Sequence, residues 1–387
     1  MYRNRQDLEH IADKGLRPYG CKNSESQGRR YPEPLHSYRL PYERDRERII
    51  HSTAWRRLEY KTQVFVNHEG DHFRTRMTHS IEVATISRVI SNTLGLNADL
   101  AEAISLAHDL GHTPFGHSGE EVLNDIMCDV GGFEHNRQSL RVVEFLEMRY
   151  PEFNGLNLCY ETREGLIKHA SRYDSPTLDL FSEDDKFPSL EAQVINLADE
   201  LAYTCHDFDD GIYSGLLKLD EIAYEIHLIQ DIIDEVQKKY GHLDAEMQRK
   251  QVVRHLINRV VTDCVLASSK LLDRFRPESV DAARTSPVPL ITISENLRSE
   301  LQKLGNYLFY NLYRNYKVIR MMQKAELVLT KLYDAFVKEP RQLPESTKAR
   351  IDDEDIRIVV ADYIAGMTDR YAMSEFKQLF DPYVKML

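Results

Sequence analysis

The chain has 387 residues, 42% of them hydrophobic, and a net charge of −12 at neutral pH, so one or two globular domains are expected rather than a disordered chain. No run of about eighteen uncharged apolar residues is present, and the first residues lead into no apolar segment, which argues against a membrane span and a secretory signal. The acidic balance also argues against general nucleic-acid binding as the main task.

The five cysteines are scattered along the chain, and no two of them have the Cys-x-x-Cys spacing. An odd and scattered set is typical of reduced thiols in a cytosol rather than of a disulfide framework. The sequence therefore predicts a cytoplasmic protein.

The N-terminal third begins with an arm and then becomes helical. Residues 1–43 are polar and interrupted by glycine and proline, which predicts an irregular arm that could wrap on a neighbouring subunit. Apolar residues then recur with helical spacing, which predicts a helix over 48–58. In 62–75, a β-prone run is followed by turn residues, so a short β-hairpin is predicted there.

Two helices are expected next. The first resumes at Thr78, carries His79 in its first turn and ends near Gly95. The second is predicted to begin with Asp99 as its N-cap and to run to Leu110 on a continuous apolar stripe.

Metal-binding and proton-transferring side chains crowd the end of that second helix. His108 and Asp109 are expected on its last turn, His112 and His117 on the loop that leaves it, and Glu120 at the start of the next helix. Few purely structural segments need so many of these side chains within fourteen residues.

A later helix carries Asp199, Tyr203 and Asp207, which are spaced four residues apart and therefore share one face. If Asp199 holds a metal, the other two would point into the same cavity and could bind a sugar hydroxyl; a partly solvated acidic face is the alternative. His206 is predicted to point elsewhere. From about residue 216 onward the pattern is that of long amphipathic helices without a chemical motif.

Four of these residues form a candidate metal-ligand set: His79, His108, Asp109 and Asp199. Imidazole nitrogens and carboxylate oxygens suit a hard or borderline divalent cation, and no cysteine lies nearby to suggest structural zinc. A lone histidine on an apolar face is more often a hydrogen-bonded core residue, but a His-Asp pair followed one turn later by another histidine is harder to explain in that way. The ion could be Mn²⁺, Mg²⁺, Co²⁺ or Fe²⁺, and the sequence does not choose among them.

Five segments, in order and at matching spacing, resemble the deoxyguanosine triphosphate triphosphohydrolase family of HD-domain proteins: 56–65, 74–79, 108–120, 131–141 and 198–203. The resemblance implies an all-α fold, with an HD metal-dependent phosphohydrolase core over 44–215. The helical region 216–387 would pack on this core as additional C-terminal helices.

The resemblance also implies an activity, the hydrolysis of dGTP or another deoxynucleoside triphosphate (dNTP) to the deoxynucleoside and inorganic triphosphate. Its metal ligands would be the four residues of the candidate set. His117 and Glu120 resemble the acid–base pair of the family, and His112 and His135 would lie around the phosphates.

Further residues match substrate-binding positions of the family. Arg76 would contact the phosphates, since a guanidinium fork suits two oxygens. Gln63 and Val64 would pack against the deoxyribose and exclude a 2′-hydroxyl, while Tyr203 and Asp207 would complete the sugar pocket.

The sequence departs from the family pattern at two places. Some relatives have a lysine directly after the last metal ligand, where this chain has Glu200, and a histidine where it has Asn315. Tyr313, Arg314 and Lys317 are therefore only speculative pocket residues.

Two other functions remain open. One is an HD phosphohydrolase acting on nucleoside monophosphates or signalling nucleotides, and the other is a nucleotide-sensing or single-stranded-DNA-binding regulator without turnover. The presence of both His117 and Glu120 argues against the second, because a decayed enzyme would lose them first. A homo-oligomer, a second, allosteric dNTP and weak single-stranded DNA binding are expected only from the resemblance, and no membrane partner is expected.

Overall fold

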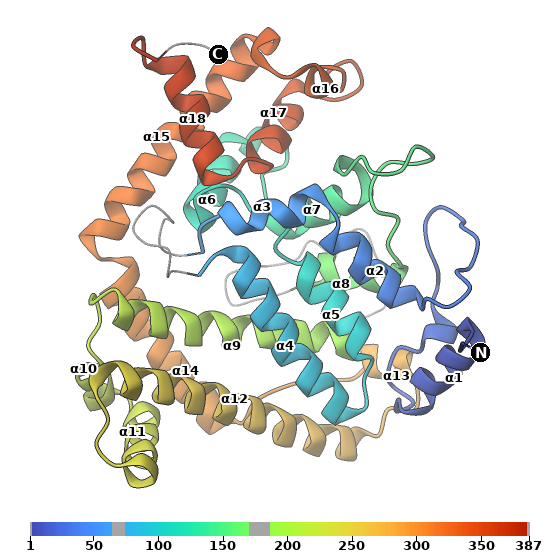
Figure 1. Cartoon of the computed structure of the whole chain (residues 1–387), viewed down its shortest axis with the longest axis vertical. Helices are drawn as coiled ribbons and strands as arrows, with labels where there is room; N and C mark the ends of the chain where they lie inside the picture. The colour runs from blue at the N-terminus through green and yellow to red at the C-terminus, as the bar shows by residue number, and fades with distance from the viewer. Residues whose placement is uncertain (1, 64–73, 170–185, 385–387) are drawn as a thin grey trace. The chain divides into compact units, whose positions relative to one another are not determined.

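The computed structural model describes residues 2–63, 74–169 and 186–384 (Figure 1). Within these ranges the secondary structure is helical, and β pairing is limited to isolated bridges. The predicted all-α fold class is therefore confirmed. No helix in the described ranges is long and apolar enough to cross a membrane.

The chain forms two compact units, each assembled from three separate segments. The first unit comprises Met1–Ile49, His79–Leu106 and Asn157–Asn315. The second unit comprises Ile50–Thr78, Ala107–Leu156 and Tyr316–Leu387. The predicted division into 1–43, 44–215 and 216–387 stays a prediction.

The N-terminal segment of the first unit is partly helical, although the sequence predicted an irregular arm. Helix α1 covers Arg5–Lys14, and the Asn4 side chain accepts a hydrogen bond from the backbone N–H of Asp7. The Asp7 carboxylate accepts one from the N–H of Asn4 in return, which completes a capping box. A short 3₁₀ turn, η1, follows at Asn23–Glu25.

The first unit is built around α9 (Leu190–Tyr213), and α12 and α14 pack against it. Apolar residues of α9 recur every three or four positions and are buried, so one face of a long helix joins the core. The other helices of this unit are α2 (Pro41–Ile50), α8 (Tyr160–Ile167), α10 (Leu219–Glu225), α11 (His227–Tyr240), α12 (Ala245–Phe275), α13 (Val280–Arg284), α14 (Glu295–Leu308) and the π-helical η6 (Phe309–Tyr313).

The second unit is built around α15 (Tyr316–Lys338), which packs against α6, α17 and α18. These helices share one buried cluster, which includes Leu123 of α6, Leu329 and Phe336 of α15, and Val360 of α17. The remaining elements are α3 (Thr53–Arg57), η2 (Leu58–Tyr60), α6 (Gly116–Ile126), η4 (Cys128–Val130), α7 (His135–Arg141), η5 (Val142–Leu146), η7 (Pro340–Gln342), α16 (Glu345–Lys348), α17 (Ile356–Ala365) and α18 (Asp369–Phe380).

Helix α4 (Arg76–Leu94) carries His79, and helix α5 (Ala98–Ala107) ends directly before His108 and Asp109, so the prediction that this pair lies on the last helical turn is wrong. The N-cap of α5 is Asn97 rather than Asp99, because the Asn97 side-chain oxygen accepts from the N–H groups of Asp99 and Leu100. Helix α5 ends at Ala107, three residues earlier than predicted.

The helix predicted over 48–58 is interrupted. Helix α2 ends at Ile50, and the Ser52 hydroxyl accepts from the N–H of Trp55 and caps α3. A hydroxyl two residues after an apolar stripe offers the backbone an alternative partner, which periodicity alone does not reveal. The predicted hairpin lies mainly in 64–73, outside the described residues; Thr62 and Thr75 beside it form an isolated antiparallel bridge.

Candidate functional site

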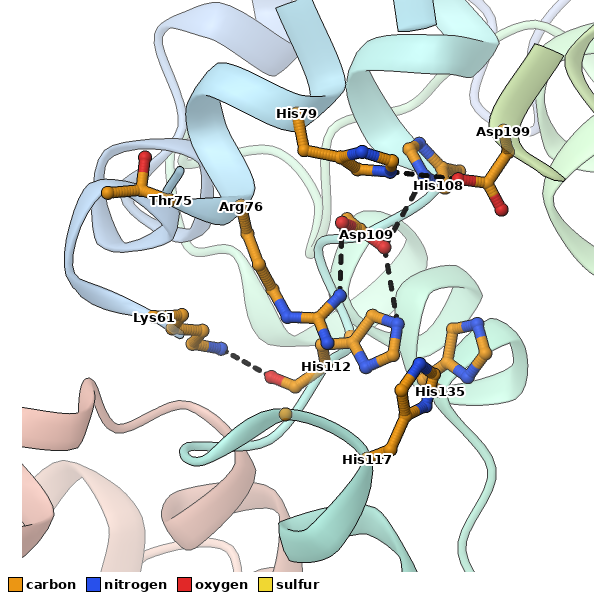
Figure 2. Close-up of polar contacts among 12 residues, drawn as sticks. Lys61, Thr75, Arg76, His79, His108, Asp109, His112, His117, His135 and Asp199 are labelled. Carbon is orange, nitrogen blue, oxygen red and sulfur yellow. Dashed lines mark hydrogen bonds and ion pairs between the residues drawn. The ribbon is translucent and has the colours of Figure 1, made fainter. Parts of the chain in front are cut away.

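A histidine–carboxylate pair whose histidine is buried lies in the first unit. His79, one turn into α4, and Asp199 of α9 have their Nε2 and Oδ1 atoms 2.8 Å apart (Figure 2). The His79 side chain is 1% exposed. The pair brings together two of the four predicted metal ligands.

Asp199 is held from its other side by a histidine that sequence reasoning missed. The Nε2 atom of His169 lies 3.3 Å from Asp199 Oδ2, and its Nδ1 atom lies 2.7 Å from the side-chain oxygen of Asn196. Asn196 is three residues before Asp199 and therefore one turn away on α9. Nothing in the local sequence around His169 indicates this contact, which joins two distant parts of the chain.

The prediction that His206 points elsewhere is wrong. Its Nδ1 atom lies 3.3 Å from Nδ1 of His79, and its Nε2 atom lies 2.8 Å from Glu82 Oε2. His206 follows Asp199 by seven residues, which is two helical turns, so both belong to the same face of α9. The seven-residue spacing in the sequence could have predicted that His206 shares the face of Asp199.

In the second unit, the other two predicted metal ligands follow the end of α5. Asp109 Oδ2 lies 3.1 Å from Arg76 Nη1, and Asp109 Oδ1 lies 3.2 Å from His112 Nε2 and 3.4 Å from His108 Nε2 (Figure 2). Burial alone would raise the pKa of Asp109, but His108, Arg76 and His112 hold that pKa well below its usual range. Asp109 is therefore a carboxylate at neutral pH.

The same unit gathers His112, His117, Glu120 and His135. Glu120 Oε1 lies 3.0 Å from His135 Nδ1, and Glu120 Oε2 lies 3.7 Å from His112 Nδ1 and 3.9 Å from His117 Nδ1. The rings of His112 and His135 stack with centroids 3.9 Å apart. His112, Glu120 and His135 could together hold a metal ion, although stacked imidazoles aim their lone pairs side by side rather than at one point.

The charges of this cluster follow from its surroundings. Burial alone would raise the pKa of Glu120, but His135, with His112 and His117, brings it below its usual value. Burial, together with Arg76 and His135, holds the pKa of His112 well below its usual range. Glu120 is thus an anion and His112 a neutral imidazole. The prediction that His117 lies on the loop and that Glu120 begins the next helix is wrong, because α6 starts at Gly116. The His117 side chain is 39% exposed.

Gly111 lets the His108–His112 turn lie directly on α7. The Ser139 hydroxyl accepts from the Gly111 N–H and donates to the His108 carbonyl. A Cβ atom at Gly111 would lie 2.2 Å from the Ser139 nitrogen and 2.3 Å from the His135 carbonyl oxygen, both backbone atoms.

We expect Gly111→Ala to destabilise the protein by at least about 1–3 kcal/mol, the usual cost of overpacking, because the backbone around it cannot yield cheaply. Thermal unfolding would measure the change. Gly15→Ala is the matched control, since its nearest neighbour would be 3.8 Å away. Equal melting temperatures for the two variants would contradict the close packing of this turn.

Lys61 is a second residue that sequence reasoning missed. It is buried in the second unit and donates hydrogen bonds to the carbonyl oxygens of His112 and Ala365, at 2.5 and 2.9 Å. Burial, with the nearby charges of Arg57 and Arg76, lowers the pKa of Lys61 from 10.5 to about 7. The amine therefore ties the His112 loop to the end of α17.

This pKa predicts a pH dependence of stability. Between about pH 7 and 10.5 the unfolded chain binds a proton at Lys61 that the folded chain lacks, so rising pH favours folding in that window. The free energy of unfolding of the natural protein, measured relative to Lys61→Met, should therefore increase with pH. Lys270→Met, at an exposed position, is the control: its free energy of unfolding should vary with pH as that of the natural protein does. If the free energy of unfolding of Lys61→Met also varied with pH in the same way as that of the natural protein, the prediction would be contradicted.

The predicted sugar-binding residues lie in the first unit. Tyr203 and Asp207 are on α9 as expected, and the Tyr313 hydroxyl of η6 donates a hydrogen bond to Asp207 Oδ2. The rings of Tyr203 and Tyr313 stack with centroids 6.4 Å apart. The guanidinium of Arg314 covers the rings of two neighbouring aromatic residues of η6.

The remaining predicted residues belong to the second unit. Gln63 is buried, and Arg76 is 1% exposed and paired with Asp109. Lys317 lies at the start of α15. Val64 lies outside the described residues.

Comparisons with known protein families agree with the helical fold and the HD motif. The HD domain family matches residues 76–204, and the phosphohydrolase-associated domain family matches residues 291–378. Together with the helical fold and the histidine–aspartate pairs, these matches define an HD-domain protein of the phosphohydrolase class.

Full-length relatives narrow the class to one family. A deoxyguanosinetriphosphate triphosphohydrolase-like protein of Geobacter metallireducens is 48% identical over 373 residues, 96% of each chain. Proteins with the same name from Bordetella pertussis and Ralstonia nicotianae are 48% and 50% identical, over 95% and 97% of this chain and 96% of each relative. The chain belongs to this deoxyguanosinetriphosphate triphosphohydrolase-like family, which confirms the resemblance found in its motifs.

Proposed function

We propose that the chain hydrolyses deoxynucleoside triphosphates, dGTP among them, to the deoxynucleoside and inorganic triphosphate. The single observation that carries this proposal is the buried Asp109 carboxylate, kept ionised by Arg76 and His112 within an HD motif. The names of its full-length relatives support the choice of substrate.

The proposed metal ligands are His79, His108, Asp109 and Asp199. Their assignment comes from the order of the motif along the chain and from the chemistry of each pair, since both pairs offer an imidazole nitrogen beside a carboxylate oxygen. These donors fit Mn²⁺, Mg²⁺, Co²⁺ or Fe²⁺. When bound, such an ion would neutralise charge on a phosphate oxygen and lower the pKa of a water molecule.

The proton for the leaving group would come from His117. Water adds its oxygen to the α-phosphorus and releases a proton to solvent, the bond from phosphorus to the 5′-oxygen breaks, and the 5′-oxygen takes up a proton as the deoxynucleoside leaves. An exposed imidazole with a carboxylate 3.9 Å away is placed to deliver that proton. Glu120 would orient His117, while His112 and His135 would lie around the phosphates.

Substrate contacts are proposed for five further residues. Arg76 would bind phosphate oxygens while it holds Asp109. Asp207 would accept a hydrogen bond from the 3′-hydroxyl, and its hydrogen bond from Tyr313 would fix its orientation. Tyr203 would line the sugar pocket, with Gln63 and Val64 packed against the deoxyribose.

Product analysis tests this function. The purified protein would be incubated with each dNTP and each of the four metals, and the products separated by chromatography. Inorganic triphosphate together with the deoxynucleoside supports the proposal. Orthophosphate or pyrophosphate would instead favour the alternative phosphohydrolase, and the absence of turnover with every pair would favour a nucleotide-binding regulator.

We further propose a cytoplasmic homo-oligomer whose activity a second dNTP stimulates, and which binds single-stranded DNA weakly. The support is family resemblance together with reduced, scattered cysteines. Hydrolysis of one nucleotide should rise when another is added, and equal rates across all pairs would contradict the stimulation.

A further inference from the structure

Three side chains of the first unit, Glu82, His206 and His79, contact one another in series. His206 contacts the ring nitrogen of His79 that does not face Asp199. His206 is 2% exposed, and its Nδ1 atom lies 3.3 Å from His79 Nδ1, with the two rings at 88° to each other. Its other nitrogen, Nε2, lies 2.8 Å from Glu82 Oε2. Glu82 is one turn after His79 on α4, so the two ends of the chain of contacts share a helix.

The direction of these hydrogen bonds follows from the donor inventory. A Glu82 carboxylate can only accept, so Nε2 of His206 must carry the hydrogen. In a neutral His206 the Nδ1 atom is then an acceptor, and the hydrogen between the two histidines must belong to Nδ1 of His79. The tautomer of His79 is thereby fixed with its lone pair on Nε2.

That lone pair faces another acceptor. Nε2 of His79 lies 2.8 Å from Oδ1 of Asp199, and two acceptors at this distance repel each other unless a cation lies between them. A histidine that ligates a metal usually donates its second ring N–H to a partner that fixes its tautomer. Here the partner is a second histidine, itself oriented by a carboxylate.

We infer that Glu82 and His206 are positioning residues that hold His79 in the tautomer whose Nε2 binds a divalent cation. The inference rests on the proposed function in one respect, that His79 is a metal ligand. It adds two residues that act through His79 and touch neither metal nor substrate.

The opposite arrangement is the competing possibility. If His206 donated from both nitrogens, His79 would accept at Nδ1 and donate from Nε2 to Asp199. The pair would then be a purely structural hydrogen bond, and Nε2 would have no lone pair for a cation.

The test measures Mn²⁺ affinity, by electron paramagnetic resonance titration of the metal-free protein. His206→Leu removes the acceptor and should weaken Mn²⁺ binding by roughly 10–100-fold, the usual effect of losing such a partner. His206→Asn can place a carbonyl oxygen near the former Nδ1 position and should restore most of that affinity. Glu82→Gln, which can donate as well as accept, should give an intermediate loss.

A matched pair elsewhere in the same unit provides the control. His255 Nδ1 and Glu235 Oε2 lie 3.9 Å apart, so His255→Leu and Glu235→Gln remove similar groups from α12 and α11. Both should leave Mn²⁺ affinity unchanged. In the unsubstituted protein loaded with diamagnetic Mg²⁺, ¹⁵N chemical shifts of the His79 ring should report a hydrogen on Nδ1 and none on Nε2.

Three outcomes would overturn the inference. Unchanged Mn²⁺ affinity in folded His206→Leu, or in Glu82→Gln if the leucine variant does not fold, would refute the positioning role while the proposed function stands. A hydrogen on Nε2 of His79 would refute it directly. Absence of Mn²⁺ binding to the natural protein would remove the metal site as well.

Discussion

Replacing Asp109 by asparagine is expected to remove the divalent metal and to lower dNTP hydrolysis by at least about 100-fold. Metal ions stabilise transition-state charge by several kcal/mol, and each 1.36 kcal/mol corresponds to about a factor of ten in rate. The amide keeps the shape of the carboxylate but not its charge, and it leaves the buried Arg76 without a counter-ion at 3.1 Å. Metal content per chain and kcat/KM would be measured together, with circular dichroism to establish that the variant is folded.

Asp362→Asn separates these effects from the general cost of losing a buried carboxylate. Asp362 is also buried in the second unit, and its Oδ2 atom lies 2.8 Å from Arg141 Nη2. Breaking a buried ion pair is expected to destabilise both variants, but only Asp109→Asn should lose metal. Full metal occupancy in Asp109→Asn would show that this residue is not a ligand.

His117→Ala is expected to keep its metal and its fold and yet lose about 10²–10⁴-fold in kcat, the usual contribution of a general acid. The side chain is 39% exposed, so its loss should cost little stability. The fall should appear in kcat rather than in metal affinity, because His117 would act on the leaving group and not on the ion.

His255→Ala is a suitable control, since its Nδ1 atom is also 3.9 Å from a glutamate, Glu235. Turnover, metal content and melting temperature of the two variants would be compared. Normal turnover in His117→Ala would refute its role as the acid, and a loss of metal would indicate that it acts through the ligands instead.

The helical features were predictable because they depend on local spacing. Asp199, Tyr203 and Asp207 share one helix, as the four-residue interval required. The same rule, applied to the seven-residue interval between Asp199 and His206, would have placed both residues on one face of α9. The helix boundaries were less certain, since Asn97 and Ser52 supply caps whose side-chain oxygens compete with continued helix.

Contacts between distant segments were not predictable. From the sequence alone, Lys61 would be assigned to the charged surface. In the structure it is buried and donates a hydrogen bond to the carbonyl oxygen of Ala365, 304 positions later. His169 contacts Asp199 from beyond the end of α8. Glu120 was paired with His117 by its three-residue spacing, but the histidine ring nearest to its carboxylate is that of His135, 3.0 Å away. Periodicity describes which face of an element is apolar, and it carries no information on which elements meet.

The order in which the ribosome makes the chain has a consequence for the second unit. Its His108–Asp109 turn is synthesised in the first third of the protein, but Lys61 and Thr62 bond to Ala365 and to Asp369, near the C-terminus. Nascent domains fold as units once their residues have emerged. The helices that complete the surroundings of this turn are therefore synthesised only near the end of translation. A chain truncated before α17 would contain the HD motif but would lack a folded second unit around the His108–Asp109 turn.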